Sequence, residues 1–174
     1  MRGTRTAWGR TGVVVIGASA ILAGCSGQVQ EAAPAFTPVV SVNELMVNWI
    51  DNASHVLWDV EHAEFAPKDD ADWTEVEDHA TQVAAAGSLI QLGGTGQADP
   101  GWVTQIGWQS NAQAMTTAAL AIRDAAKRRD LGAVTKANSD LVDSCEGCHK
   151  QFKPELPSEG IAHQRPHSES HKNR

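Results

Sequence analysis

Cys145, Cys148 and His149 stand together near the C-terminal end of the chain, in the order Cys-Glu-Gly-Cys-His. Two thiols at this spacing can form thioethers with the two vinyl groups of a haem, and the histidine that follows can bind its iron. The same Cys-x-x-Cys spacing also occurs in redox-active dithiols and in half of a zinc site. However, a dithiol of that kind normally belongs to a βαβ fold, and a zinc site needs a second pair of ligands. The pattern therefore predicts one covalent haem c on the two cysteines, with His149 as the proximal iron ligand.

The third cysteine, Cys25, ends an N-terminal segment that is typical of export signals. Three arginines within the first ten residues precede an apolar stretch over 11–22, which is too short for a comfortable membrane span. The stretch ends in Leu-Ala-Gly-Cys, which resembles the bacterial lipobox. We therefore expect a signal peptide over 1–24 and lipidation of Cys25. The alternative is an ordinary cleaved signal that happens to contain a cysteine.

Export also predicts a location and a kind of partner. A lipid-anchored protein on the periplasmic side of a bacterial envelope is expected, and Ser26, in place of an aspartate, resembles lipoproteins of the outer membrane. Loss of residues 1–24 removes three arginines and no acids, so the formal net charge changes from −7 to −10. Such a chain is poorly suited to nucleic acid or to anionic lipid surfaces, and it suits redox partners with basic surfaces.

A short proline-containing tether over 25–40 leads into the first of four amphipathic segments. Ser41 and Glu44, three residues apart, predict a capping box at its start. Apolar residues then recur at steps of three and four as far as about residue 60, which indicates one helix face.

Three further helices are expected after this one. The second is predicted over about 72–91 and the third over about 99–129, where Asp99 would be the N-cap and the following proline the first helical residue. The fourth is predicted over about 130–153, with Asp130 as its cap. The alternation of apolar and polar residues that marks strands is missing from the sequence after the signal.

The sequence thus predicts an all-α domain over 41–153, arranged as an antiparallel up-down-up-down four-helix bundle. A polar tail over 154–174 is predicted to be disordered. Its histidines recur every fourth residue, a spacing that could hold a metal only if the tail were helical; they are His163, His167 and His171.

A second axial ligand for the haem iron can be sought among the methionines. If the helices alternate in direction, the start of the first helix lies at the same end as the end of the fourth. Met46, one turn into the first helix, can then face His149 across a haem. The alternative is that Met46 only packs within the apolar stripe. Met115 is expected about 22 Å from that end of the third helix, as core.

Other side chains are weaker candidates for the site. His55 and His79 are rival iron ligands, but the first lies at the edge of the stripe and the second among acids. Trp102 and Ile106 begin the third helix and are expected to wall the haem pocket. Lys153, next to the haem motif, could pair with a haem propionate, or it could be an ordinary surface lysine.

A haem motif near the end of the last of four helices resembles the cytochrome c′ family, over about 41–153. Phe152 and Lys153 follow the motif where that family has an aromatic and then a basic residue. The start of the domain, Glu44-Leu45-Met46, also looks like exported members of the group. The chain departs from the family in having phenylalanine where tyrosine is commoner, and in its C-terminal extension.

The resemblance implies two possible functions. Low-spin members of this group use a methionine from the first helix and transfer single electrons, and Met46 favours that function. Cytochrome c′ proper leaves the position open and binds gases such as nitric oxide or carbon monoxide. Leu45, next to the methionine, keeps this alternative open. The resemblance also makes a homodimer possible. A catalytic grouping of serine, histidine and aspartate cannot be placed, so we expect a protein that is not an enzyme.

Overall fold

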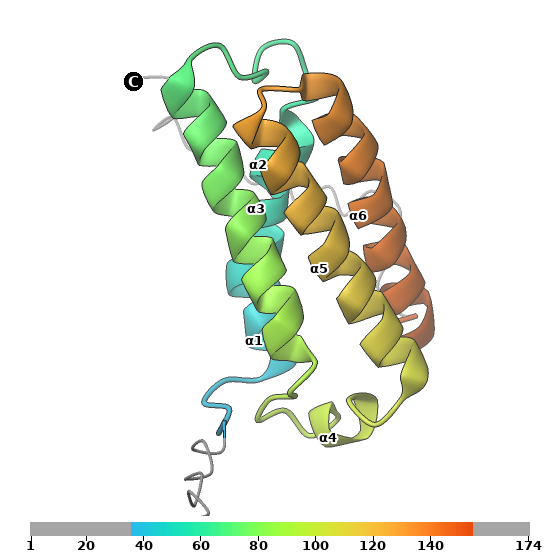
Figure 1. Cartoon of the computed structure of the whole chain (residues 1–174). Helices are drawn as coiled ribbons and strands as arrows, with labels where there is room; N and C mark the ends of the chain where they lie inside the picture. Colours follow the sequence, from blue (N-terminus) through green and yellow to red (C-terminus); the bar gives the residue numbers. More distant parts are fainter. Residues whose placement is uncertain (1–35, 155–174) are drawn as a thin grey trace, which may run out of the picture. The chain divides into compact units, whose positions relative to one another are not determined.

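The computed structural model describes residues 36–154, and this part of the chain folds into packed helices without a strand (Figure 1). The predicted all-α bundle is confirmed. The signal peptide, Cys25, the tether up to residue 35 and the tail histidines lie outside the described residues. The elements in chain order are α1 (Val42–Leu45), η1 (Met46–Ile50), α2 (Asp51–Asp59), α3 (Asp70–Ile90), α4 (Asp99–Trp102), α5 (Ile106–Lys127) and α6 (Leu131–Phe152).

The first three elements follow one another without a gap and form one continuous rod, which we call the first rod. It begins with the predicted capping box. The Ser41 hydroxyl accepts the N–H of Glu44 at 3.1 Å, and the Glu44 carboxylate accepts the N–H of Ser41 at 2.8 Å. Helix α3 is capped by Asp69, which accepts two backbone N–H groups, and α6 is capped by Asp130, as predicted. The sequence signals for these helix starts are local, because each hydrogen bond joins a donor and an acceptor at most three residues apart.

The prediction of the third helix, over about 99–129, is wrong in two respects. This segment is broken into the short helix α4 and the long helix α5, with a turn over 103–105 between them. In addition, Asp99 is not the N-cap of α4. That position belongs to Ala98, because the carboxylate of Asp99 is bonded to backbone N–H groups elsewhere. The residue after α3 that reverses the chain is Gly93, whose φ of 91° suits a glycine.

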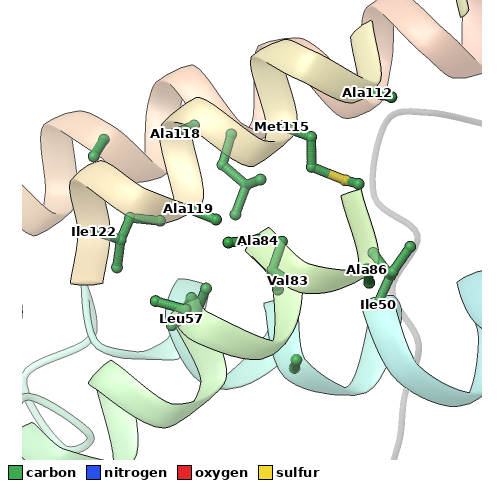
Figure 2. Close-up of a cluster of buried hydrophobic side chains, with 14 of the residues drawn as sticks. Ile50, Leu57, Val83, Ala84, Ala86, Ala112, Met115, Ala118, Ala119 and Ile122 are labelled. Carbon is green, nitrogen blue, oxygen red and sulfur yellow. The ribbon is translucent and has the colours of Figure 1, made fainter. Parts of the chain in front are cut away.

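The long helices pack so that α5 lies between α3 and α6, while the first rod packs against α3. Leu57, Val83 and Ile122, from three different elements, meet in a core where none of them is exposed (Figure 2). Small residues on α3 and α5, including Ala84 and Ala119, allow these two helices to approach closely.

Helix directions alternate, so the start of the first rod, the end of α3, the start of α5 and the end of α6 share one end of the bundle (Figure 1). We call this the α4 end, because α4 also lies there. Farther from it, the Asn138 amide of α6 donates a hydrogen bond of 2.6 Å to the carbonyl of Leu57 and ties the first rod to α6. None of the helices within residues 36–154 is long and apolar enough to cross a membrane.

Candidate haem centre

A cavity of about 640 Å³ lies towards the α4 end, between the first rod, α5 and α6. This volume falls within the range of small-molecule and cofactor sites, about 300–1,000 Å³. Its walls are mostly apolar, as a haem macrocycle requires. The apolar residues that line it include Val42, Ile50, Ile90, Trp108, Ala112 and Met115.

The four side chains predicted to hold the haem line this one cavity. Cys145, Cys148 and His149 lie on the last two turns of α6, where spacings of three and four residues place them on one face. Met46 approaches from the first rod, and it is partly buried. The two thiols, the imidazole and the thioether thus form a donor set that fits a covalently attached haem with two axial ligands.

The backbone changes from α to π geometry at Met46. Residues 46–50 form the π turn η1, in which the N–H of Asp51 bonds to the carbonyl of Met46, five residues earlier. A π turn accommodates one extra residue within a helix, and it commonly marks a functional site. Here it begins at the candidate ligand and lies within the wall of the cavity.

Both thiols are protonated at neutral pH. Burial raises the pKa of Cys145 to about 11, and burial together with the neighbouring Cys145 raises that of Cys148 to about 11. A redox-active dithiol needs a lowered pKa, so this environment does not favour that alternative. Nor do the residues described contain a cluster of three or more His, Cys, Asp or Glu side chains that could hold a zinc ion.

Electrostatics also keep His149 available as a ligand. Burial lowers its pKa below the ordinary value of 6.5, and the positive charge of Lys153 lowers it further. The imidazole is therefore neutral at pH 7, and a neutral ring has the lone pair that binds iron.

An aromatic cluster lines the cavity towards the α4 end. The rings of Trp102 and Trp108 are stacked with their centroids 5.1 Å apart, and Phe152 meets Trp108 edge-on at 5.1 Å. Lys153 places its ammonium 5.4 Å from the centre of the Trp102 ring. Trp102 and Lys153 thus lie at the cavity, as expected, while the pairing of Lys153 with a propionate stays a prediction.

A family model described as Cytochrome C′ matches residues 54–153, more than half of the chain. This chain belongs to the cytochrome c′ family. The match includes Cys145, Cys148 and His149, but it begins after Met46. No curated protein and no solved structure matches the chain.

Cytochrome c′ proteins bind a covalently attached c-type haem, and this chain has the thiols and the cavity for one. The family is generally periplasmic and comprises electron-transfer and gas-binding cytochromes. Because the matched region excludes Met46, the case for a second axial ligand depends on the geometry of the cavity.

The prediction that Ile106 lines the pocket is wrong. The side chain of Ile106 is 88% exposed, and it does not line the cavity. The turn over 103–105 shifts the helical register, so Trp108, only 2% exposed, occupies the wall instead.

The expected position of Met115 is also wrong. Because α5 begins at Ile106, the methionine is nine residues into the helix, or about 14 Å from its start. It is a core residue, 4% exposed, but it also lines the cavity. Met115 is therefore a second thioether that any test of iron ligation must include.

The rival histidines bond to their own helices. The Nδ1 atom of His55 lies 2.9 Å from the carbonyl of Asp51, and that of His79 lies 2.8 Å from the carbonyl of Glu75. Neither histidine lines the cavity.

Ser54 and Trp58 are among the cavity residues that were not anticipated from the sequence. They continue the line that Met46 and Ile50 begin along the first rod, at steps of four residues. Their polar atoms are buried without a hydrogen-bond partner. The four-residue spacing from Met46 was the signal that could have identified them.

Proposed function

We propose that the chain carries single electrons in the cell envelope, with its haem iron bound between His149 and Met46, and that it is not an enzyme. The observation that supports this is the placement of the two side chains on different walls of one cavity, Met46 on the first rod and His149 on α6. A haem c with histidine and methionine ligands exchanges one electron, and the weakly donating methionine raises its potential.

The protein contributes a largely apolar environment. Ile50 and Ile90 are almost fully buried in the walls, and Trp108, 2% exposed, lines the cavity towards the α4 end. Exclusion of water and a low local polarity tune the potential of a metal centre. Because Ile50, Ile90 and Trp108 are packed in the core, little rearrangement of these side chains would accompany electron transfer.

The proposal places the protein on the periplasmic side, held by acyl chains on Cys25 to the outer membrane. Its partner would be a redox protein with a basic surface, since Asp51 and Glu146 line the cavity and the whole chain is acidic. Charge-steered association of this kind weakens as salt rises. A homodimer stays compatible with the proposal.

The visible spectrum of the oxidised and reduced holoprotein, with and without carbon monoxide, tests the proposal. We expect a low-spin spectrum that the gas does not change. The substitution Met46→Leu should produce a high-spin spectrum and ready binding of carbon monoxide. Met115→Leu is the matched control, because it removes the other cavity thioether and should leave the spectrum low-spin.

The opposite results have definite meanings. A wild-type protein that is high-spin and binds carbon monoxide readily would contradict Met46 ligation and identify a gas-binding cytochrome with an open site. Conversion to high spin by Met115→Leu, but not by Met46→Leu, would transfer the ligand role to Met115.

A further inference from the structure

Asp99 has an unusual position for a charged residue, because its side chain is inside the protein and only 2% exposed. One carboxylate oxygen, Oδ2, accepts two backbone N–H groups at 2.9 Å each, from Val42 and from Gly96. Val42 is the first residue of α1, 57 positions earlier in the chain. The carboxylate therefore satisfies an N–H group that the start of a helix leaves without a helical partner.

The loop before α4 is shaped around this carboxylate. A Cβ atom on Gly96 would lie 2.8 Å from both of its oxygens, and one on Gly94 would lie 2.6 Å from the backbone nitrogen of Val42. The N–H of Thr95 also bonds to the carbonyl of Val40 at 3.0 Å. The loop before α4 is thus hydrogen-bonded to Val40 and Val42, at the start of the first rod. Figure 1 shows this loop beside the start of α1.

The hydrogen bond from Val42 to Asp99 lies one helical turn from Met46, the candidate iron ligand. Val42 and Met46 are four residues apart, and both line the cavity. Farther along the rod, Leu57 is buried in the core and accepts the hydrogen bond from Asn138. The π turn therefore lies between two fixed points, Asp99 at one end and the core at the other.

Loss of the fixed point at Val42 would release the short end of the rod. The π turn could then convert to α geometry, and each residue of helical slip rotates a side chain by about 100° around the helix axis. Such a rotation would turn Met46 away from the cavity.

We propose that Asp99 is a positioning residue that fixes the start of α1 and so presents Met46 to the haem iron. The inference depends on the ligation by Met46 proposed above. It assigns to Asp99 the control of how readily this ligand leaves the iron, and therefore of how readily an external ligand such as carbon monoxide enters.

The holoprotein variant Asp99→Ala tests this inference. Hydrogen bonds to a charged acceptor are strong enough that their loss should speed the binding of carbon monoxide to the ferrous protein by roughly tenfold. A high-spin fraction should appear in the oxidised spectrum. Asp99→Asn should largely restore the wild-type behaviour, because an amide oxygen in place of Oδ2 can accept the same two N–H groups.

Asp69→Ala is the control for simple destabilisation. Asp69 accepts two backbone N–H groups at the start of α3, at the end of the bundle away from the cavity. Its loss should lower stability without changing the spectrum or the kinetics of carbon monoxide. Asp99→Ala behaving like Asp69→Ala would overturn the inference.

A second pair of variants keeps the test decisive if Asp99→Ala yields no holoprotein. Gly96→Ala keeps Asp99 in the sequence but puts a methyl group 2.8 Å from both carboxylate oxygens, so that the carboxylate or the loop must shift, whereas a Cβ atom on Gly101 would meet nothing within 4 Å. Faster carbon monoxide binding in Gly96→Ala than in Gly101→Ala is expected, and equal rates would contradict the inference. Failure of the ligation itself is distinguishable, since Met46→Leu would then leave the spectrum unchanged.

Discussion

The indole nitrogen of Trp108 donates a hydrogen bond of 2.9 Å to the backbone carbonyl of Ile90. The bond joins the first turn of α5 to the last residue of α3 across the loop that contains α4. Trp108 is also stacked on Trp102 in the wall of the candidate haem cavity. The same side chain thus satisfies a carbonyl at a helix end and forms part of the site, so that fold and site depend on one contact.

Trp108→Phe should therefore lower the free energy of unfolding by about 0.5–1.5 kcal/mol, because it keeps an aromatic ring but leaves the carbonyl of Ile90 with only the longer bond of 3.3 Å from the N–H of Gly93. Denaturant unfolding of the holoprotein, followed by circular dichroism, measures this change. Trp49→Phe is the control, since Trp49 lies outside the cavity and no hydrogen bond from its indole is seen within the described residues. Equal midpoints for the two variants would contradict the prediction.

The helix starts could be predicted from the sequence because their signals are local. The capping box of Ser41 and Glu44 and the cap at Asp130 each involve residues three positions apart. The cysteines and the histidine of the haem motif are likewise contained within five residues. The alternation of helix directions then placed Met46 at the correct end of the bundle.

What could not be predicted depends on contacts between distant segments. Asp99 has the type and position of an N-cap, yet its acceptor is used by Val42, 57 residues away. The break before Ile106 and the resulting register of Trp108 follow from the packing of α4 and from the bond to Ile90. The π turn at Met46 could not be recognised in the sequence either. The residue that it inserts into the helix still leaves the apolar positions three or four apart, as in an ordinary α-helix.

Replacement of glycine by alanine should change stability in opposite directions at two positions, Gly87 in α3 and Gly132 in α6. Gly87 lies where α3 and α5 are in close contact. A Cβ atom on Gly87 would collide with the hydroxyl of Thr116 and lie 3.3 Å from the carbonyl of Ala112. That hydroxyl is bonded to the same carbonyl at 2.9 Å, so it cannot turn away without loss of its bond. Gly87→Ala should destabilise the fold by about 1–3 kcal/mol despite the better helix propensity of alanine.

Gly132→Ala is the matched substitution. It lies in the first turn of α6, where the nearest atom to an added Cβ is the Asp130 carboxylate at 3.6 Å. Without a clash, alanine should stabilise the fold by about 0.4–1 kcal/mol, because it restricts the unfolded chain. Thermal unfolding of both variants gives the comparison, and a stabilised Gly87→Ala would show that the two helices are not packed as described.

The two thiols give a direct test of covalent haem attachment. Each of Cys145→Ala and Cys148→Ala should keep haem on the chain through the remaining thioether, at reduced yield, and the double variant should release it. Haem staining of the denatured protein after electrophoresis measures this. Cys25→Ser should keep full staining and lose only the proposed lipid. Haem that stays attached in the double variant would contradict the assignment of both cysteines.

The capping box predicts a pH dependence of stability. The backbone N–H and the hydroxyl of Ser41 hold the pKa of Glu44 below its ordinary value of 4.5. Because the folded state favours the carboxylate, this contribution is complete above pH 4.5 and is lost as the pH falls through the lowered pKa. Ser41→Ala removes the hydroxyl that accepts the N–H of Glu44, keeps the backbone bond to the Glu44 carboxylate, and should cost about 1 kcal/mol at neutral pH.

Urea midpoints between about pH 6 and pH 3 test this dependence. Wild type should exceed Glu44→Gln in stability near pH 6, and the difference should shrink as the pH approaches 3, because protonation removes the charge that the variant already lacks. Glu61→Gln, at an exposed carboxylate that follows the first rod, is the control and should differ little from wild type at either pH. A gap between wild type and Glu44→Gln that stays constant across this range would show that the charge of Glu44 does not contribute to the cap.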